Sequence, residues 1–351
     1  MIRNSFRWIA SHQVISFFII TFLITWGLGF SYIAVMREKY LFLPLMFLAT
    51  CGPAIAGIIV ASVSDSDRQS ARKRFSWLAL LICWVVVTMV FVANQFFVNK
   101  GPVSPPLVIL IAVSSLPVAF IVNIAYTRFP VLRGFKLKSA GSGTSLSWII
   151  IAFVLFPVLT IISVLISRLM GHETPSLSGL PATGFGLAGL FAIKFLSQFF
   201  YFNGTGEEVG WRGFALPRLQ AQTSPLVAGL ILALFWVPWH LFLWTGEGRD
   251  VMTVSFWASS YLLHIPSAII LCWCYNRSRG SVLAAGIAHA SANTIVAFLQ
   301  PQEPNVMIIV FFVFAAIIVL ADRMWKRLPD EHPAVQRIFP VGSPSGLSGE
   351  R

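Results

Sequence analysis

Ten stretches of about twenty apolar residues follow one another along this 351-residue chain, and they constrain its fold more than any other feature. An α-helix needs about 20 apolar residues to cross the hydrocarbon core of a bilayer. Because backbone groups in lipid must be satisfied within the protein, we predict an all-α polytopic transmembrane helical bundle of about 8–10 spans. The predicted spans are 14–35, 41–63, 75–97, 106–126, 146–166, 184–202, 225–244, 253–274, 282–299 and 306–320.

Composition and charge support a membrane protein whose partner is the lipid bilayer. Hydrophobic residues make up 57% of the chain and charged residues 11%, whereas a soluble domain carries roughly 25% charged residues. The net charge of +12 is spread over short connections between apolar stretches. This is the pattern of topology signals, so we exclude nucleic acid as a partner.

The basic residues in the connections predict the orientation of the chain. Loops on the cytoplasmic side of a membrane protein carry an excess of lysine and arginine. One side has Arg3, Arg7, Arg68, Arg72, Lys73, Arg74, Arg128, Arg133, Lys136 and Lys138, and the other has Arg37, Lys39, Lys100 and Arg168. We therefore predict a multi-pass integral protein of the plasma membrane with both termini in the cytoplasm.

Two adjacent carboxylates, Glu207 and Glu208, stand next to the sixth apolar stretch, and the chain has only 13 acidic residues. Placing an ionisable group at membrane depth costs free energy, so such a residue usually has a function. Arg212 follows Glu208 by four residues, so the two could form a salt bridge on one helix face. The segment 207–222 mixes polar and apolar residues, which predicts an interfacial helix after the Glu-Glu motif.

Two further polar pairs lie inside later apolar stretches. Trp236 and His240 are four residues apart, and so are His289 and Asn293, so each pair shares a helix face. Taken singly, such residues often form hydrogen bonds between membrane helices. Together with the Glu pair they predict a hydrolytic site.

In such a site one glutamate acts as general base toward a water, and histidine and asparagine supply donors to an oxyanion. Glu207 is the predicted base and Glu208 the partner of Arg212, although the residues alone allow the reverse. Glu207, His240 and His289 could instead bind Zn²⁺, because histidine nitrogen and carboxylate oxygen are ordinary zinc ligands. The His-Glu-x-x-His motif of common zinc proteases is absent from the sequence. No cofactor is therefore certain, and zinc remains an open alternative.

The ordered set of motifs resembles the CAAX protease and bacteriocin-processing family, called CPBP or Abi, whose members are intramembrane endopeptidases related to the type II CAAX prenyl endopeptidase. The family pattern is Glu-Glu-x-x-x-Arg, an aromatic residue four before a histidine, and His-x-x-x-Asn. Residues 207–212, 236–240 and 289–293 match these three motifs, and Trp236 stands where phenylalanine is commoner.

The resemblance implies roles for the matching residues. Glu207 and His240 would activate the water, and His289 and Asn293 would stabilise the oxyanion. Glu208 and Arg212 would organise the site, with Trp236 beside them. The site would lie within the bilayer, open to the cytoplasm, and cleave a peptide or membrane-protein substrate that carries a prenyl group in some members. Members are described both as metalloproteases and as metal-independent glutamate proteases.

With this resemblance the chain divides into three parts: N-terminal transmembrane helices (1–183), a catalytic membrane core (184–320) and a disordered cytoplasmic tail (321–351). Two rival functions use the same residues. An ion-coupled transporter also needs intramembrane glutamate and histidine. A non-catalytic membrane scaffold of the same family is the other rival. Lys194 and His264 lie in apolar stretches without an assigned role, and Asn203 stands out only as part of a glycosylation sequon.

Overall fold

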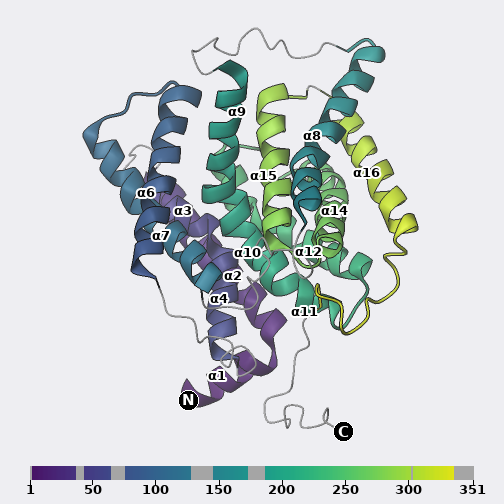
Figure 1. The fold of residues 1–351 in the computed structure, drawn as a ribbon, viewed down its shortest axis with the longest axis horizontal. Coiled ribbons are helices and arrows are strands. Elements are labelled where there is room, and N and C mark those ends of the chain that lie inside the picture. Colours follow the sequence, from purple (N-terminus) through teal and green to yellow (C-terminus); the bar gives the residue numbers. More distant parts are fainter. Residues whose placement is uncertain are drawn as a thin grey trace.

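A computed structural model describes residues 2–36, 43–64, 76–127, 145–172, 186–301 and 303–335 of the chain. Every regular element within these ranges is a helix, which agrees with the predicted all-α bundle (Figure 1). The elements, in which η marks π-helices, are α1 (Ile2–Ser11), α2 (Gln13–Met36), α3 (Leu43–Thr50), α4 (Gly52–Val63), α6 (Trp77–Ala93), η2 (Asn94–Val98), α7 (Pro105–Thr127), α8 (Leu146–Leu169), α9 (Gly186–Ser197), η5 (Gln198–Glu207), α10 (Glu208–Gly210), η6 (Trp211–Ala215), α11 (Leu216–Gln220), α12 (Pro225–Trp239), α13 (Leu241–Gly246), α14 (Val254–Arg277), α15 (Val282–Leu299) and α16 (Pro304–Ala321).

Eight helical segments within the described ranges are long and apolar enough to cross a membrane. They correspond to eight of the ten predicted spans. The other two predicted spans, 41–63 and 184–202, form interrupted helices. The first breaks between α3 and α4, where Pro53 occupies the first turn of α4. The second passes from α9 into the π-helix η5.

The segment after the Glu pair differs from the predicted interfacial helix. Every residue from Glu208 to Gln220 is buried, so α10, η6 and α11 lie inside the bundle. Gly210 makes this possible, because a Cβ atom at that position would lie 2.3 Å from the carbonyl carbon of Pro53 in α4. The polar side chains of the segment bond to the protein: Arg218 donates from Nε to Oε1 of Gln13 over 2.7 Å. A segment of mixed polar and apolar residues can lie at the membrane surface with its polar side chains in water, or it can be buried with those side chains hydrogen-bonded to the protein. The sequence pattern alone does not distinguish the two cases.

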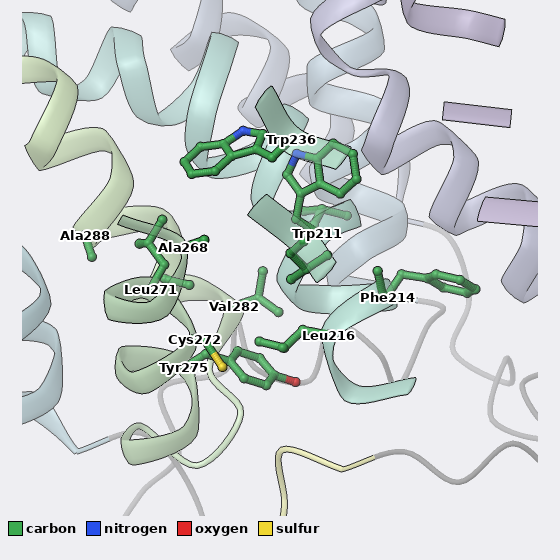
Figure 2. Packing of buried hydrophobic residues seen from close by; sticks show 14 of the residues in the cluster. Trp211, Phe214, Leu216, Trp236, Ala268, Leu271, Cys272, Tyr275, Val282 and Ala288 are labelled. Atoms are coloured by element: carbon green, nitrogen blue, oxygen red, sulfur yellow. The ribbon is translucent and has the colours of Figure 1, made fainter. Parts of the chain in front are cut away.

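A packed apolar layer supports this buried segment. Figure 2 shows Trp211, Phe214 and Leu216 of the segment together with residues of α14 and α15, including Tyr275 and Val282. All of these side chains belong to one cluster of buried apolar residues. The segment that carries the Glu pair is therefore held against α14 and α15.

Two ends of the bundle can be told apart by direct contacts. At one end, Gln13 at the start of α2 donates to Ser64 after α4 and accepts from Arg218 of α11. At the same end, the amide of Leu226 in α12 bonds to the carbonyl of Met324 after α16. We call this the α11 end. At the other end, the α13 end, Gly246 of α13 adjoins Ile33 of α2.

The chain after α16 packs across the α11 end. Asp322 forms an ion pair with Arg277 at the end of α14, at 2.7 Å. Gln220 donates from Nε2 to the carbonyl oxygen of Ala334 over 2.8 Å. Residues 322–335 are thus held against the bundle, whereas the sequence predicted a disordered tail from residue 321 on. Residues 336–351 of that predicted tail lie outside the described residues.

Candidate active site

Glu207 ends the π-helix η5, and its carboxylate is fixed by two donors. Asn203, one turn earlier, donates from Nδ2 to Oε1 over 2.9 Å, and Trp236 of α12 donates from Nε1 to Oε2 over 2.7 Å. The residue is 3% exposed. Each carboxylate oxygen can accept two hydrogen bonds, so both oxygens keep a lone pair for a further donor. π-Helical turns within α-helices often occur at functional sites.

Glu208 has a different environment although it is the next residue. Its Oε1 lies 2.7 Å from Nη1 of Arg212 and 2.8 Å from Nδ1 of His289. The side chains of Glu208 and Arg212 are 0% and 1% exposed. The guanidinium of Arg212 also lies 4.9 Å from the centre of the Trp236 ring. Glu208 and Arg212 therefore form a buried ion pair beside the residue that holds Glu207.

His240 follows α12, whose first turn is fixed by Pro225 and by the hydroxyl of Ser224, which accepts from the amide of Val227. Nδ1 of His240 lies 2.8 Å from the carbonyl oxygen of Trp236. A carbonyl oxygen only accepts, so Nδ1 carries the hydrogen and a neutral ring presents its lone pair on Nε2. An Nε2 lone pair of this kind can accept a hydrogen bond from water.

His264 of α14 repeats this arrangement. Its Nδ1 lies 2.7 Å from the carbonyl oxygen of Ser260, so its Nε2 carries the lone pair in the neutral ring. The rings of His240 and His264 are 5.0 Å apart, and each also lies against the ring of Trp236. Two histidines therefore stand side by side with the same tautomer.

His289 and Asn293 share one face of α15, as predicted, but contact different partners. His289 bonds to Glu208, whereas Asn293 donates from Nδ2 to Oδ1 of Asn203 over 2.9 Å. Asn203 in turn donates to Glu207. A chain of hydrogen bonds thus joins Asn293 to Glu207 through Asn203, and the second N–H of the Asn293 amide is free for another acceptor.

A cavity of about 640 Å³ adjoins these groups. Its inner wall is polar and includes Glu207, His240, His264, Asn203 and Asn293. Further out its walls are mainly apolar, and its rim is charged. The remaining lining residues are Met46, Thr50, Gln198, Leu243, Trp244, Glu247, Arg249, Phe256, Ser259, Ser260, Leu263, Pro304 and Ile308.

The cavity brings together three of the five residues predicted to be catalytic. Glu207, His240 and Asn293 line it, whereas Glu208 and His289 lie behind its wall with Arg212. Trp236 connects the two groups, since it bonds to Glu207 and its ring contacts those of His240 and His289. Lys194, on α9, does not line the cavity.

The predicted zinc ligands do not form a metal site. Within the described ranges, no three side chains of histidine, cysteine, aspartate or glutamate are placed to hold an ion together. Glu207 and His240 line the cavity, whereas His289 lies behind its wall with Nδ1 directed at Glu208. The set Glu207, His240 and His289 therefore does not fit a shared metal ion.

Sequence reasoning missed two residues of the site, Asn203 and His264. Asn203 precedes Glu207 by four residues, the spacing of neighbours on a helix face, and this signal was available. His264 is an ionisable residue in an apolar stretch, which also marks candidate sites. Only the packing of α14 against α12 shows that His264 reaches His240.

The cavity opens toward the α13 end. Its rim residues Glu247 and Arg249 follow α13 and have more than half of their side-chain surface exposed. Toward the α11 end it is closed by the buried residues 208–220. Helix α1 and residues 322–335 lie at the α11 end, whereas the cavity opens at the α13 end. The two ends face opposite sides of the membrane. Both chain ends and the opening of the site therefore cannot all be on the cytoplasmic side, as the sequence analysis expected.

Comparison with known proteins links the segment that carries the site to a protein family. Residues 189–295 match the family model described as type II CAAX prenyl endopeptidase Rce1-like. The match includes all the residues discussed above on the inner wall of the cavity and behind it. One similar curated protein is CAAX prenyl protease 2 of Methanococcus maripaludis, which is 29% identical over 203 residues, or 55% of this chain and 71% of the relative.

Proposed function

We propose that this chain, whose residues 189–295 belong to the Rce1-like family of type II CAAX prenyl endopeptidases, is an intramembrane endopeptidase that uses a glutamate-activated water. One observation carries the proposal. A carboxylate, an imidazole with a free Nε2 and an amide with a free N–H line the inner wall of one cavity in the membrane part of the protein. These are the groups that hydrolysis of a peptide bond requires.

Glu207 acts as the general base in this proposal. Asn203 and Trp236 hold its carboxylate and leave a lone pair on each oxygen. A water that donates one hydrogen to Glu207 and the other to Nε2 of His240 directs its own lone pair away from both. That lone pair attacks the carbonyl carbon of the scissile bond while Glu207 takes the proton. General bases typically contribute roughly 10²–10⁴-fold to the rate.

Asn293 stabilises the negative charge that develops on the carbonyl oxygen. One N–H of its amide is used by Asn203, and the other is free to donate to the oxyanion. When the tetrahedral intermediate collapses, the C–N bond breaks and the proton held by Glu207 passes to the leaving amine. Atoms and charges balance with water and peptide as the only reactants.

Glu208 and Arg212 organise the site from behind the cavity wall, where they form a buried ion pair. Nδ1 of His289 lies 2.8 Å from Oε1 of the same glutamate, so His289 joins α15 to this pair. His289 thus acts in this proposal as a positioning residue, because it lies behind the wall rather than in the lining of the cavity.

The substrate in this proposal is a peptide or a segment of a membrane protein. The apolar middle of the cavity, with Leu243, Trp244, Phe256 and Leu263, fits an apolar side chain or a lipid-modified one. The name of the Methanococcus maripaludis relative points to prenylated substrates for that protein. A prenylated peptide is therefore the first probe to use.

The test is peptide cleavage by the purified full chain. Farnesylated and unmodified versions of one peptide are incubated with wild type, His240→Ala and His332→Ala, and the products are identified by mass spectrometry. We expect wild type and His332→Ala to cleave one internal bond and His240→Ala to lose most of the activity. His332 lies at the α11 end, away from the cavity, so it is a matched control. Equal cleavage by all three proteins would contradict the proposal.

A further inference from the structure

A second cavity lies at the α11 end of the bundle, apart from the one that contains Glu207. Its volume is about 240 Å³, and it is enclosed by the end of α14, the start of α12 and the segment that follows α16. That volume corresponds to roughly eight water molecules at about 30 Å³ each. The second cavity shares no lining residue with the first, and the proposed reaction does not use it.

The side chains that line the second cavity carry a net positive charge. Arg277 and Lys326 are cations, and Asp322 is the only anion among the lining residues. Burial, together with the positive charge of Arg279, lowers the pKa of His332, so this imidazole is neutral near pH 7. Two positive charges and one negative charge leave the lining at +1.

The acceptor groups of the second cavity already have donors within the protein. Oδ2 of Asp322 accepts from Nε of Arg277 and from Nε1 of Trp273, each over 2.7 Å, and Oδ1 accepts from Nη2 of Arg277 over 2.8 Å. Asn276 exchanges two hydrogen bonds with Gln220 of α11. A ligand therefore meets mainly donors in this cavity.

The donors that remain favour an anionic ligand. Among the residues that the structure describes, the ammonium group of Lys326 has no ion-pair partner. The ion pair with Asp322 uses two of the five N–H donors of the Arg277 guanidinium. Arginine and lysine are the usual protein ligands of phosphate, which offers several acceptor oxygens and a negative charge. The lining of the second cavity is thus suited to a phosphate group.

The second cavity lies at the level of the lipid headgroups. The membrane-spanning helices α14 and α16 end beside it, at Arg277 and Ala321. Trp273 lines the cavity, and its ring centre is 5.5 Å from that of Trp148 in the first turn of α8. Trp325, after α16, is exposed. Because tryptophan is enriched at the two surfaces of a membrane, these three residues mark the headgroup region.

An exposed apolar face of α16 leads from the membrane interior to the second cavity. Ile309, Val313, Ile317 and Leu320 recur at helical spacing, and each has more than half of its surface exposed. Figure 1 shows α16 at the edge of the bundle, beside α8. The acyl chains of a lipid can pack along this face while its headgroup lies in the cavity.

We propose that the second cavity binds the phosphate of an anionic glycerophospholipid whose acyl chains lie along α16. Lys326 and Arg277 donate to the phosphate oxygens. A lining of +1 favours an anionic lipid over a zwitterionic one, whose phosphate charge is offset by its own cation. Basic sites between membrane helices bind lipid headgroups in this way. The bound lipid joins α14 to residues 322–335, and the inference does not depend on the proposed proteolysis.

Lipid binding by the purified full chain tests the inference. Phosphatidylglycerol or phosphatidylcholine with identical acyl chains is added to the delipidated protein in detergent, and bound lipid is measured by native mass spectrometry. The proteins are wild type, Lys326→Gln, Lys326→Arg and Arg168→Gln. Arg168 is the matched control, because it is an exposed cation in the last turn of the spanning helix α8 and does not line the second cavity.

We expect wild type, Lys326→Arg and Arg168→Gln to bind phosphatidylglycerol more tightly than phosphatidylcholine. Lys326→Gln should bind phosphatidylglycerol about fivefold more weakly, the usual effect of one basic residue at an anionic membrane surface. Because Lys326 is exposed, its variants should unfold at the wild-type temperature when no lipid is present.

Three results would overturn the inference. They are equal binding of the two lipids by wild type, undiminished binding of phosphatidylglycerol by Lys326→Gln, and an equal loss in Lys326→Gln and Arg168→Gln, which would indicate surface charge alone. Glycerol 3-phosphate is added as a competitor. If it displaces the lipid at an equal concentration, the cavity binds a soluble phosphate instead of a lipid. Since no peptide is cleaved in this assay, failure of the proposed protease activity leaves its result unchanged.

Discussion

At the scale of single residues, the two neighbouring glutamates differ in their partners. Glu207 accepts hydrogen bonds from neutral groups and borders the cavity, whereas Glu208 pairs with charged or chargeable groups and is fully buried. Glu207 can therefore contact a reactant in the cavity, whereas Glu208 joins α10 to α15 through its bond to His289. We therefore expect variants of Glu207 to lose activity and variants of the Glu208 ion pair to lose stability.

Arg212→Met should destabilise the protein strongly. Removing one partner of a buried ion pair leaves an uncompensated charge and typically costs about 3–5 kcal/mol. The measurement is thermal unfolding in detergent, compared with Arg249→Met. Arg249 also pairs with a glutamate, but both side chains are exposed, so that change should cost no more than about 1 kcal/mol. Equal unfolding temperatures for the two variants would show that the buried pair does not stabilise the fold.

His264→Phe should lower kcat and leave the fold unchanged. Phenylalanine keeps the ring against Trp236 but removes the Nε2 lone pair beside His240. Because Glu207 remains, the loss should be smaller than the roughly 10²–10⁴-fold of a missing general base. His12→Phe is the control: His12 makes the same contact with a carbonyl one turn earlier but lies outside the cavity. Unchanged kcat in His264→Phe would remove His264 from the site.

A chelator should leave peptide cleavage unchanged. The predicted zinc ligands do not converge, and Glu207 is held by Asn203 and Trp236 instead. Cleavage rates are measured with and without 1,10-phenanthroline, and an unrelated zinc protease serves as a positive control. Loss of cleavage that added Zn²⁺ restores would require a metal at the site and would contradict the ligand arrangement described here.

At the scale of elements, the site depends on interrupted helices. The break between α3 and α4 and the π-helix η5 both lie beside the Glu pair, where regular helices would place the side chains differently. Gly210 brings α10 onto the backbone of α4, and Gly286 brings α15 to within reach of Gly204 in η5. Small residues allow such close approaches between membrane helices.

Gly210→Ala should destabilise the protein, because the added Cβ would lie 2.3 Å from backbone atoms of Pro53, which cannot move aside cheaply. Overpacking of this kind typically costs about 1–3 kcal/mol. Gly27→Ala is the matched control, since a Cβ on Gly27 meets no atom within 4 Å. Thermal unfolding of both variants is the measurement. A Gly210→Ala protein as stable as Gly27→Ala would show that α4 and α10 are not in close contact.

The sequence predicted most of the elements but not their interruptions. Hydropathy identified eight helices that the structure also has, because length and apolar character suffice for a span. It could not show that 208–220 is buried, because that depends on Gly210 meeting Pro53, two residues far apart in the chain. Likewise the motif spacings indicated His240 and Asn293, but the roles of Asn203 and His264 depend on contacts between helices.

At the scale of the whole molecule, the position of the cavity distinguishes the two ends of the helical bundle. The packed segment 322–335 lies at the closed α11 end, and the cavity opens at the α13 end. The sequence indicates which part of each apolar stretch carries the polar groups, but the direction of the cavity also depends on the buried segment 208–220, which closes the α11 end. That burial became visible only when the helices were packed together.

Cleavage of one peptide by Glu207→Gln, beside wild type and Glu331→Gln, tests the central claim most directly. Glutamine keeps the size of the side chain and an acceptor oxygen but cannot take a proton, and Glu331 is an exposed residue outside the cavity. We predict that Glu207→Gln stays folded, although its NH2 group must face one of the two donors, Asn203 or Trp236, and that it loses cleavage by at least roughly 10²-fold, whereas Glu331→Gln cleaves normally. A stable Glu207→Gln protein that cleaves the peptide at the wild-type rate would contradict the account.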